Sequence, residues 1–186
     1  AAPTINLGPA LNFANQVEGT ASAAQTVTLT NASPVAITLT SAISVSSAGP
    51  FSVSPSGAIP CTSGLVLAGG ASCTASVVFA PTSVGSFGNG LTVSYQVITS
   101  LLNTGSSLGG NSLAPTFTLG PALNFGSVAV GGSSAAQTVT FTNTSPTNLT
   151  VTVGPSSSNA VFSATPSGAT PCNVSTVVPP AGTCTF

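Results

Sequence analysis

The chain contains an internal repeat, and this feature constrains its fold most. Residues 7–13 (LGPALNF) return unchanged as residues 119–125, and residues 23–28 (AAQTVT) return as residues 135–140 at the same spacing. With one residue deleted, Cys61 and Cys73 return as Cys172 and Cys184. The sequence therefore predicts two copies of one structural unit.

The second copy is shorter than the first. After Cys73 the first copy continues to about residue 113, whereas the second stops two residues after Cys184, at Phe186. We expect a complete unit at 1–114 and a truncated unit at 115–186. Either the polypeptide continues beyond this chain, or strands from another molecule complete the second unit.

Polar and apolar residues alternate along most of the chain, which is the pattern of half-buried β-strands. Short strands separated by Gly, Pro and Asn turns, in units of this length, predict an all-β fold of two tandem immunoglobulin-like β-sandwiches, the second without its last strands. In the first unit we expect strands at 11–13, 26–30, 36–40, 51–54, 65–67, 74–79 and 91–97, with an edge strand within 98–102. In the second we expect strands at 138–142, 149–153 and 161–164. The Gly/Ser-rich residues 105–112 lead into a predicted hinge at 112–116.

Charged side chains are almost absent: Glu18 is the single acidic residue, and the chain has no Lys, Arg or His. General acid–base catalysis and activation of a serine nucleophile both need a titratable side chain beside the reacting group. Glu18 is replaced by Val130 in the second copy, which favours a solvated loop residue over a catalytic acid. We therefore expect no enzyme and no cofactor.

The same composition excludes several binding partners. Nucleic-acid phosphates and anionic lipid surfaces are bound through Lys and Arg, which this chain lacks. No apolar run approaches the roughly 18 residues of a membrane-spanning helix, so no membrane insertion is expected.

The four cysteines predict one local disulfide in each copy, Cys61 with Cys73 and Cys172 with Cys184, and hence an oxidising, extracellular compartment. Their spacing is wider than that of the Cys pairs in zinc sites, and no His is present, so a metal site is not expected. Closing a loop of this size stabilises a fold by about 3 kcal/mol in the chain-entropy description. Buried, unlinked cysteines are the alternative.

Two phrases resemble a known family. Residues 123–131 (LNFGSVAVG) followed by 137–143 (QTVTFTN), and residues 79–87 (FAPTSVGSF) followed by 91–95 (LTVSY), are similar to the Hydin-like (ASH) and choice-of-anchor D repeats of bacterial surface proteins. The resemblance implies immunoglobulin-like sandwiches in extracellular tandem arrays, with no catalytic residues to transfer. The near-absence of charge and the missing end of the second copy depart from the family pattern.

A sandwich without its last strands exposes an apolar groove and an unpaired edge, which recruits another strand. Head-to-tail addition does not close and gives a filament, so we expect a homopolymeric extracellular filament. Candidate inter-subunit strands are the N-terminal segment, with Ile5 and Leu7, and residues 98–108, with Leu101 and Leu102. The alternative is an excerpt of a long tandem-repeat stalk or adhesin.

Two features of the sequence concern carbohydrates. Asn31, Asn143, Asn148 and Asn173 each begin an N-x-S/T sequence and are candidate N-glycosylation sites, or plain turn asparagines. A carbohydrate-binding module is the rival function, but the chain has no Trp and one Tyr. Tyr95 is expected at the rim of its strand rather than in a ligand platform.

Overall fold

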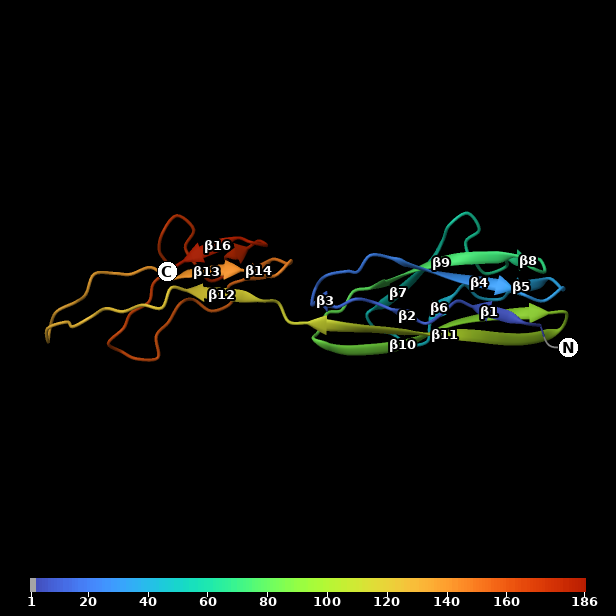
Figure 1. Ribbon diagram of the computed structural model, residues 1–186, viewed down its shortest axis with the longest axis horizontal. Helices are drawn as coiled ribbons and strands as arrows, with labels where there is room; N and C mark the ends of the chain where they lie inside the picture. Colours follow the sequence, from blue (N-terminus) through green and yellow to red (C-terminus); the bar gives the residue numbers. More distant parts are fainter. Residues whose placement is uncertain (1–2) are drawn as a thin grey trace. The chain divides into compact units, whose positions relative to one another are not determined.

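The computed structural model describes residues 3–186 and divides into two units, Ala1–Ala114 and Pro115–Phe186. Every regular element in these residues is a β-strand (Figure 1). The predicted all-β, immunoglobulin-like class is confirmed. Among the described residues there is no helix that is long and apolar enough to span a membrane.

Unit 1 is a sandwich of two sheets. The first sheet has the antiparallel order β1-β4-β9-β7, formed by Ile5–Leu7, Gln25–Asn31, Ser72–Phe79 and Phe51–Ser56. The second has the order β2-β11-β10-β5-β8, formed by Leu11–Asn12, Ser100–Leu113, Gly85–Val97, Ile37–Leu39 and Val66–Leu67. The short strands β3 (Gln16–Val17) and β6 (Ser44–Val45) pair with β11 and β10.

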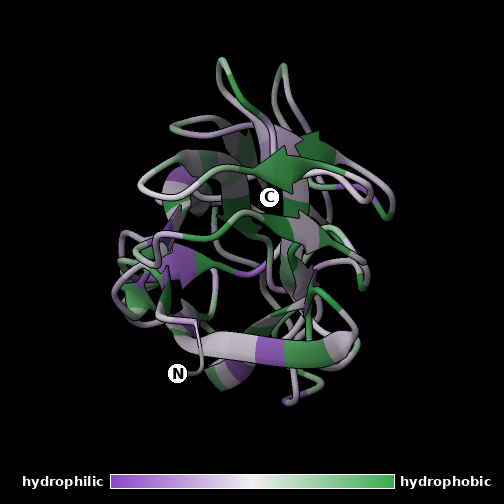
Figure 2. Ribbon diagram, turned by 90° about the vertical axis from the view of Figure 1, so that its right-hand side faces the viewer, coloured by the Kyte–Doolittle hydropathy of each residue, from purple (hydrophilic) through white to green (hydrophobic). Residues whose placement is uncertain are grey.

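The sandwich forms because alternate residues of each strand are apolar. Along β9, Cys73, Ala75, Val77 and Phe79 are all buried, whereas the intervening residues are half exposed. Figure 2 shows hydrophobic residues interleaved with residues of intermediate hydropathy along the strands. A side-chain period of two places one set of residues between the sheets, which fixes the register of each strand.

The edge strand is longer than the sequence predicts. Instead of lying within 98–102, β11 continues through the Gly/Ser-rich stretch at 105–112 and pairs with β10 from Gly85↔Ser112 to Val97↔Ser100. A Cβ on Gly110 would lie 2.8 Å from the Phe79 ring, and one on Gly105 would lie 2.7 Å from the Leu91 carbonyl oxygen. These glycines allow close packing, which is a recognised role of glycine within strands.

Four phenylalanines join the two sheets at one end of the unit 1 core. Phe51 stacks on Phe79 with ring centroids 4.9 Å apart, and Phe13 and Phe87 each lie 5.9 Å from Phe79. Phe79 is at the centre of this group and is fully buried. Aromatic pairs at such distances add to the stabilisation that burial alone supplies.

Unit 2 has fewer and shorter strands. One sheet has the order β12-β13-β16, formed by Phe117–Gly120, Thr140–Asn143 and Thr183–Thr185, and the other pairs β14 (Leu149–Thr150) with β15 (Val177–Val178). Its buried core consists of Cys172, Val178 and Cys184, with Phe141, Val151 and Phe186 packed against it.

The predicted strand at 161–164 does not form. Its equivalent in unit 1, β7, pairs with β9 from Phe51↔Phe79 to Ser56↔Thr74. In unit 2 the strand equivalent to β9 is β16, which ends at Thr185 and so offers no partner to residues 161–164. The strands β13 and β14 are also shorter than expected. Without a partner strand, alternation alone does not produce regular structure.

Candidate functional site

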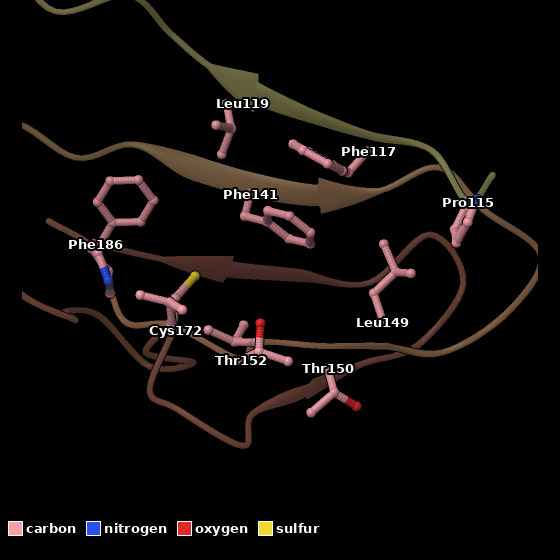
Figure 3. Close-up of a pocket in the computed structure, with 12 residues that line it drawn as sticks. Pro115, Phe117, Leu119, Phe141, Leu149, Thr150, Thr152, Cys172 and Phe186 are labelled. Carbon is pink, nitrogen blue, oxygen red and sulfur yellow. The ribbon is translucent and has the colours of Figure 1, made fainter.

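An apolar groove of about 460 Å³ lies on unit 2. Figure 3 shows side chains of β12 and β13, including Phe117, Leu119 and Phe141, beside Leu149 and Cys172. The remaining lining residues are Pro115, Thr150, Val151, Thr152, Val153, Pro155 and Phe186. No charged residue lines the groove, so it suits an apolar occupant.

The internal repeat shows that the groove residues are core positions without a cover. Leu119 is 57% exposed, whereas its equivalent in unit 1, Leu7, is 7% exposed. Outside the groove lining, Phe162 is 51% exposed, whereas its equivalent Phe51 is 3% exposed. Leu149 and Val151 are half-buried, although the equivalent Ile37 and Leu39 are buried. Sequence reasoning did not name these groove residues, but aligning the two copies would have found them.

In unit 1 the cover is the hairpin of β10 and β11. It contributes the buried side chains Leu91, Val93, Tyr95 and Leu108 to the core. Tyr95 pairs with Leu39 of β5. In unit 2 the strand equivalent to β5 is β14. It pairs with β15 on one side, and no strand of the described residues pairs with its other side. Unit 2 therefore presents an open strand edge beside an apolar groove.

The candidate inter-subunit strands are both paired within unit 1. Ile5 and Leu7 lie in β1, which pairs with β4, and Leu7 is buried. Leu101 and Leu102 lie in β11, where they pair with Gln96 and Tyr95 of β10. Leu101 is exposed and Leu102 is half-buried. Their role in another subunit stays a prediction, and donation of either whole strand requires it to leave its present sheet.

Both disulfides are present: Cys61–Cys73 in unit 1 and Cys172–Cys184 in unit 2. In unit 1 the disulfide joins β9 to the segment before β8, and in unit 2 it joins β16 to the segment before β15. All four cysteines are buried, and Cys172 also lines the groove. The structure contains no free cysteine among its described residues.

Reduction is expected to distinguish the two disulfides. Because the groove leaves unit 2 with a smaller core, local opening there needs less free energy than in unit 1. Cys172–Cys184 should therefore be reduced about tenfold faster or more, which corresponds to about 1.4 kcal/mol in opening free energy. Timed reduction, alkylation and mass spectrometry of chymotryptic peptides measure both rates. Equal rates in the isolated chain would contradict the expectation.

Asn31 and Asn143 are not glycosylation sites in this fold, which corrects the sequence-based expectation. Both are fully buried. The Asn31 Nδ2 group donates to the carbonyl oxygens of Val35 at 2.8 Å and Leu67 at 3.0 Å. The Asn143 Nδ2 group donates to those of Thr147 at 2.7 Å and Val178 at 2.8 Å. An enclosed amide with its hydrogens used in this way has no room for a glycan.

Asn148 and Asn173 are both exposed in unit 2. Asn148 immediately precedes β14, and Asn173 lies next to the Cys172 disulfide. Their glycosylation stays a prediction.

The rest of the site chemistry is sparse. Tyr95 is buried rather than at the rim of its strand, which corrects its expected position and removes it as a sugar platform. The described residues contain no group of three or more His, Cys, Asp or Glu side chains that could hold a metal ion. The remaining candidate features are the apolar groove of unit 2 and the open edge of β14, both of which suit association with another β-segment.

No protein-family model matches the chain, and no curated protein matches it in sequence. Among solved structures, the ASH/PapD-like domain 7 of human CEP192 gives a TM-score of 0.44 at 13% identity, covering 59% of this chain and 85% of that one. A chaperone–tip adhesion subunit complex from Csu pili of Acinetobacter baumannii gives 0.40 at 11% identity, covering 100% and 87%. The VesB protease of Vibrio cholerae gives 0.47 at 19% identity, covering 57% and 31%. With TM-scores this low, nothing about the activity of the chain follows from these similarities.

Proposed function

We propose that the chain is a structural subunit of an extracellular filament, in which unit 2 accepts a β-segment from a neighbouring subunit. The observation that carries the proposal is the difference between the two copies. Leu7, Ile37 and Leu39 are buried in unit 1, and the equivalent residues of unit 2, Leu119, Leu149 and Val151, line an open groove. Burying one Leu or Phe side chain stabilises a structure by about 1.5–3 kcal/mol, so the groove favours an occupant.

Strand addition supplies the second part of the interaction. An unpaired strand edge offers backbone N–H and C=O groups to an incoming segment, and alternate side chains of that segment enter the groove. β14 has such an edge among the described residues. Addition of one subunit to unit 2 of the next is a heterologous contact, which repeats to form a filament.

The composition supports close association of subunits. Sheet edges are commonly protected from pairing by charged residues, especially Lys. This chain has no Lys or Arg and one acidic residue, so it carries little charge to oppose the packing of subunits. The two disulfides favour an extracellular or periplasmic location, where such bonds persist. We also propose that the chain is a member of the Hydin-like or choice-of-anchor D repeats that its sequence resembles.

Cryo-EM of the native assembly tests the source of the occupant. Density from a neighbouring subunit over Phe117, Phe141 and Val151 is the expected result. Density that is continuous with Phe186 would instead make the chain part of a tandem array, such as a surface stalk, and would overturn the strand-exchanged filament. An assembly in which the groove is empty would also overturn it.

A charge placed in the groove should abolish assembly. Leu119→Lys puts an ammonium group where an apolar segment is expected, and desolvating that group costs several kcal/mol. Val174→Lys is the matched control, because Val174 is similarly exposed in unit 2 but does not line the groove. Analytical ultracentrifugation and negative-stain microscopy of both variants measure assembly. Filaments of Leu119→Lys that match those of the control would contradict the proposal.

A further inference from the structure

We propose that the open edge of β14 in unit 2 pairs with the outer edge of β11, residues Ser100–Gly105, in unit 1 of a second copy of this chain. The strand β11 stays paired with β10 in its own sandwich while its other edge covers the groove of the neighbour. The assignment rests on the proposed function and names its donor segment. Each chain then has one donor edge and one acceptor edge, so addition of chains repeats without closing.

The first half of β11 has an unpaired outer edge. β10 lies along one side of the whole strand, whereas β2 and β3 pair only with its second half on the other side. There the Phe13 N–H group donates to the carbonyl oxygen of Gly109 at 2.8 Å, so Gly109 turns its backbone groups away from β10. Backbone direction alternates along a strand. The residues that turn their backbone groups to the same outer side are therefore Leu101, Asn103 and Gly105.

The open edge of β14 presents backbone groups in the same way. Val151 makes two backbone hydrogen bonds, of 2.9 and 2.8 Å, with the segment that leads into β15, so it turns away from the open edge. Thr150 and Thr152, on either side of it, turn toward that edge. Unit 1 shows what this position binds. Thr40, the equivalent of Thr152, donates its N–H group to the carbonyl oxygen of Ser94 in β10 at 2.9 Å.

The side chains of the two edges fall on matching faces when these outward groups pair. On both edges the outward residues have exposed side chains. Antiparallel pairing, the orientation of β10 on β5, therefore extends the exposed face of one sheet into that of the other. It also places Leu102 and Thr104, both half-buried, on the face of Leu149 and Val151, which line the groove. Leu102 then gains apolar contacts beyond those it makes with the unit 1 core.

Neither edge is protected against pairing. Sheet edges are commonly protected by charged residues or proline. Residues 100–105 and 149–153 contain neither, and the single charged side chain of the whole protein is Glu18. Two uncharged edges meet without the cost of desolvating a charge.

The turn before the donor segment is strained and apolar. Ile98 has a φ of 55° and its side chain is 88% exposed. A positive φ is unfavourable for a β-branched residue, and most of the described residues with positive φ are glycines. The Gln96 Nε2 group donates to the Ile98 carbonyl oxygen at 2.9 Å and holds the turn in this conformation. Strain of this kind is concentrated at binding sites, and contact with a neighbouring chain gives the exposed side chain a role.

Two proline variants test the pairing and its source. Asn103→Pro removes an outward N–H group from the donor edge, and Thr152→Pro removes one from the acceptor edge. Proline is tolerated in an edge strand where the N–H group faces outward. The matched controls are Asn103→Thr and Thr152→Ser, because each keeps the N–H group. Tyr95 fluorescence during denaturation checks that unit 1 of Asn103→Pro is folded.

Each proline variant alone should form about tenfold less filament than its control, or less still. An equimolar mixture of the two should form a heterodimer that does not grow, because Asn103→Pro keeps its β14 edge and Thr152→Pro keeps its β11 edge. Analytical ultracentrifugation and negative-stain microscopy measure both results.

Hydrogen exchange of the unsubstituted chain gives a test that needs no variant. The amides of Leu101, Asn103 and Thr152 should exchange about 100-fold more slowly in the assembled chain than in the dispersed chain. Equal exchange in the two states would overturn β11 as the donor, whether or not the proline variants fold.

The possible failures separate the donor from the filament. Filaments of Asn103→Pro without filaments of Thr152→Pro would overturn β11 as the donor and leave the proposed function standing. Filaments of both variants would overturn the donor and strand addition at β14 together. A segment of the same polypeptide in the groove would give no heterodimer in the mixture, which would also overturn both. An unsubstituted chain that never assembles would have the same consequence.

Discussion

Replacing Phe51 by Ala is expected to destabilise unit 1 by about 3–5 kcal/mol, whereas the equivalent Phe162→Ala should cost unit 2 about 1 kcal/mol or less. Phe51 is buried between Phe13 and Phe79, and its removal leaves a cavity in the aromatic cluster. Phe162 contacts Phe125 but is half exposed to solvent. The same side chain at the same place in the repeat is therefore expected to contribute differently to the stability of the two units.

Tyr95 makes the first measurement direct. It is the only tyrosine, the chain has no tryptophan, and it is buried in unit 1, so its fluorescence during denaturation reports that unit. The midpoint temperature of the Tyr95 transition should fall by about 10 °C or more in Phe51→Ala. Hydrogen exchange at 140–143 and 183–185 reports unit 2 for Phe162→Ala.

Assembly should remove the difference between the two variants. If an occupant covers Phe162 in the filament, Phe162→Ala should weaken the assembled unit 2 about as much as Phe51→Ala weakens unit 1. A loss of 3 kcal/mol or more in isolated Phe162→Ala would show that Phe162 is already buried in the free chain, contrary to its 51% exposure in the structure.

The strands of unit 1 were predictable because alternation there is supported by pairing. Residues 26–30, 36–40 and 74–79 alternate in the sequence, and each lies in or around a strand with neighbours on both sides. Residues 162–164 (FSA) also alternate but form no strand. The difference lies in long-range pairing, which a local pattern does not contain.

The extension of the edge strand through residues 105–112 could not be predicted from their glycine content. Linkers and close-packed strands both use glycine. In linkers it makes the backbone flexible, and in strands it lets neighbouring groups pack close to the backbone. Only the position of Phe79 opposite Gly110 distinguishes the two, and that contact joins distant parts of the sequence. Glycosylation was misjudged at Asn31 for a related reason, since the N-x-S/T pattern does not reveal the carbonyl groups that enclose the side chain.

Asn31→Asp is expected to be strongly destabilising, and increasingly so as the pH rises. The substitution keeps the shape of the side chain but removes the amide hydrogens that reach Val35, Leu67 and Ala68 at 2.8, 3.0 and 3.1 Å. A buried carboxylate facing carbonyl oxygens is disfavoured relative to its protonated form, which retains one O–H donor. The pKa of the new carboxyl group should therefore rise in the folded state above its ordinary value of about 3.9.

The direction of the pH dependence follows from that rise. Below about pH 4 the carboxyl group is mostly protonated in both states, so the variant then loses only the contribution of the missing amide donor. As the pH increases toward the raised pKa of the folded state, the unfolded state ionises first and the free energy of unfolding falls. A rise of about three pKa units corresponds to about 4 kcal/mol, much of the stability of a typical domain.

The composition of the chain makes the pH dependence of the Asn31→Asp variant easy to measure. Glu18 is its only acidic side chain, so few native groups contribute a pH dependence of their own. Asn103→Asp, at an exposed position of β11 in the same unit, is the matched control and should change the Tyr95 transition by no more than about 0.5 kcal/mol at any pH. An Asn31→Asp variant that is as stable as this control at pH 7 would refute the buried hydrogen-bonding role of Asn31. A variant that is weaker by the same amount at pH 3 and pH 7 would show that lost donors, rather than charge burial, account for the cost.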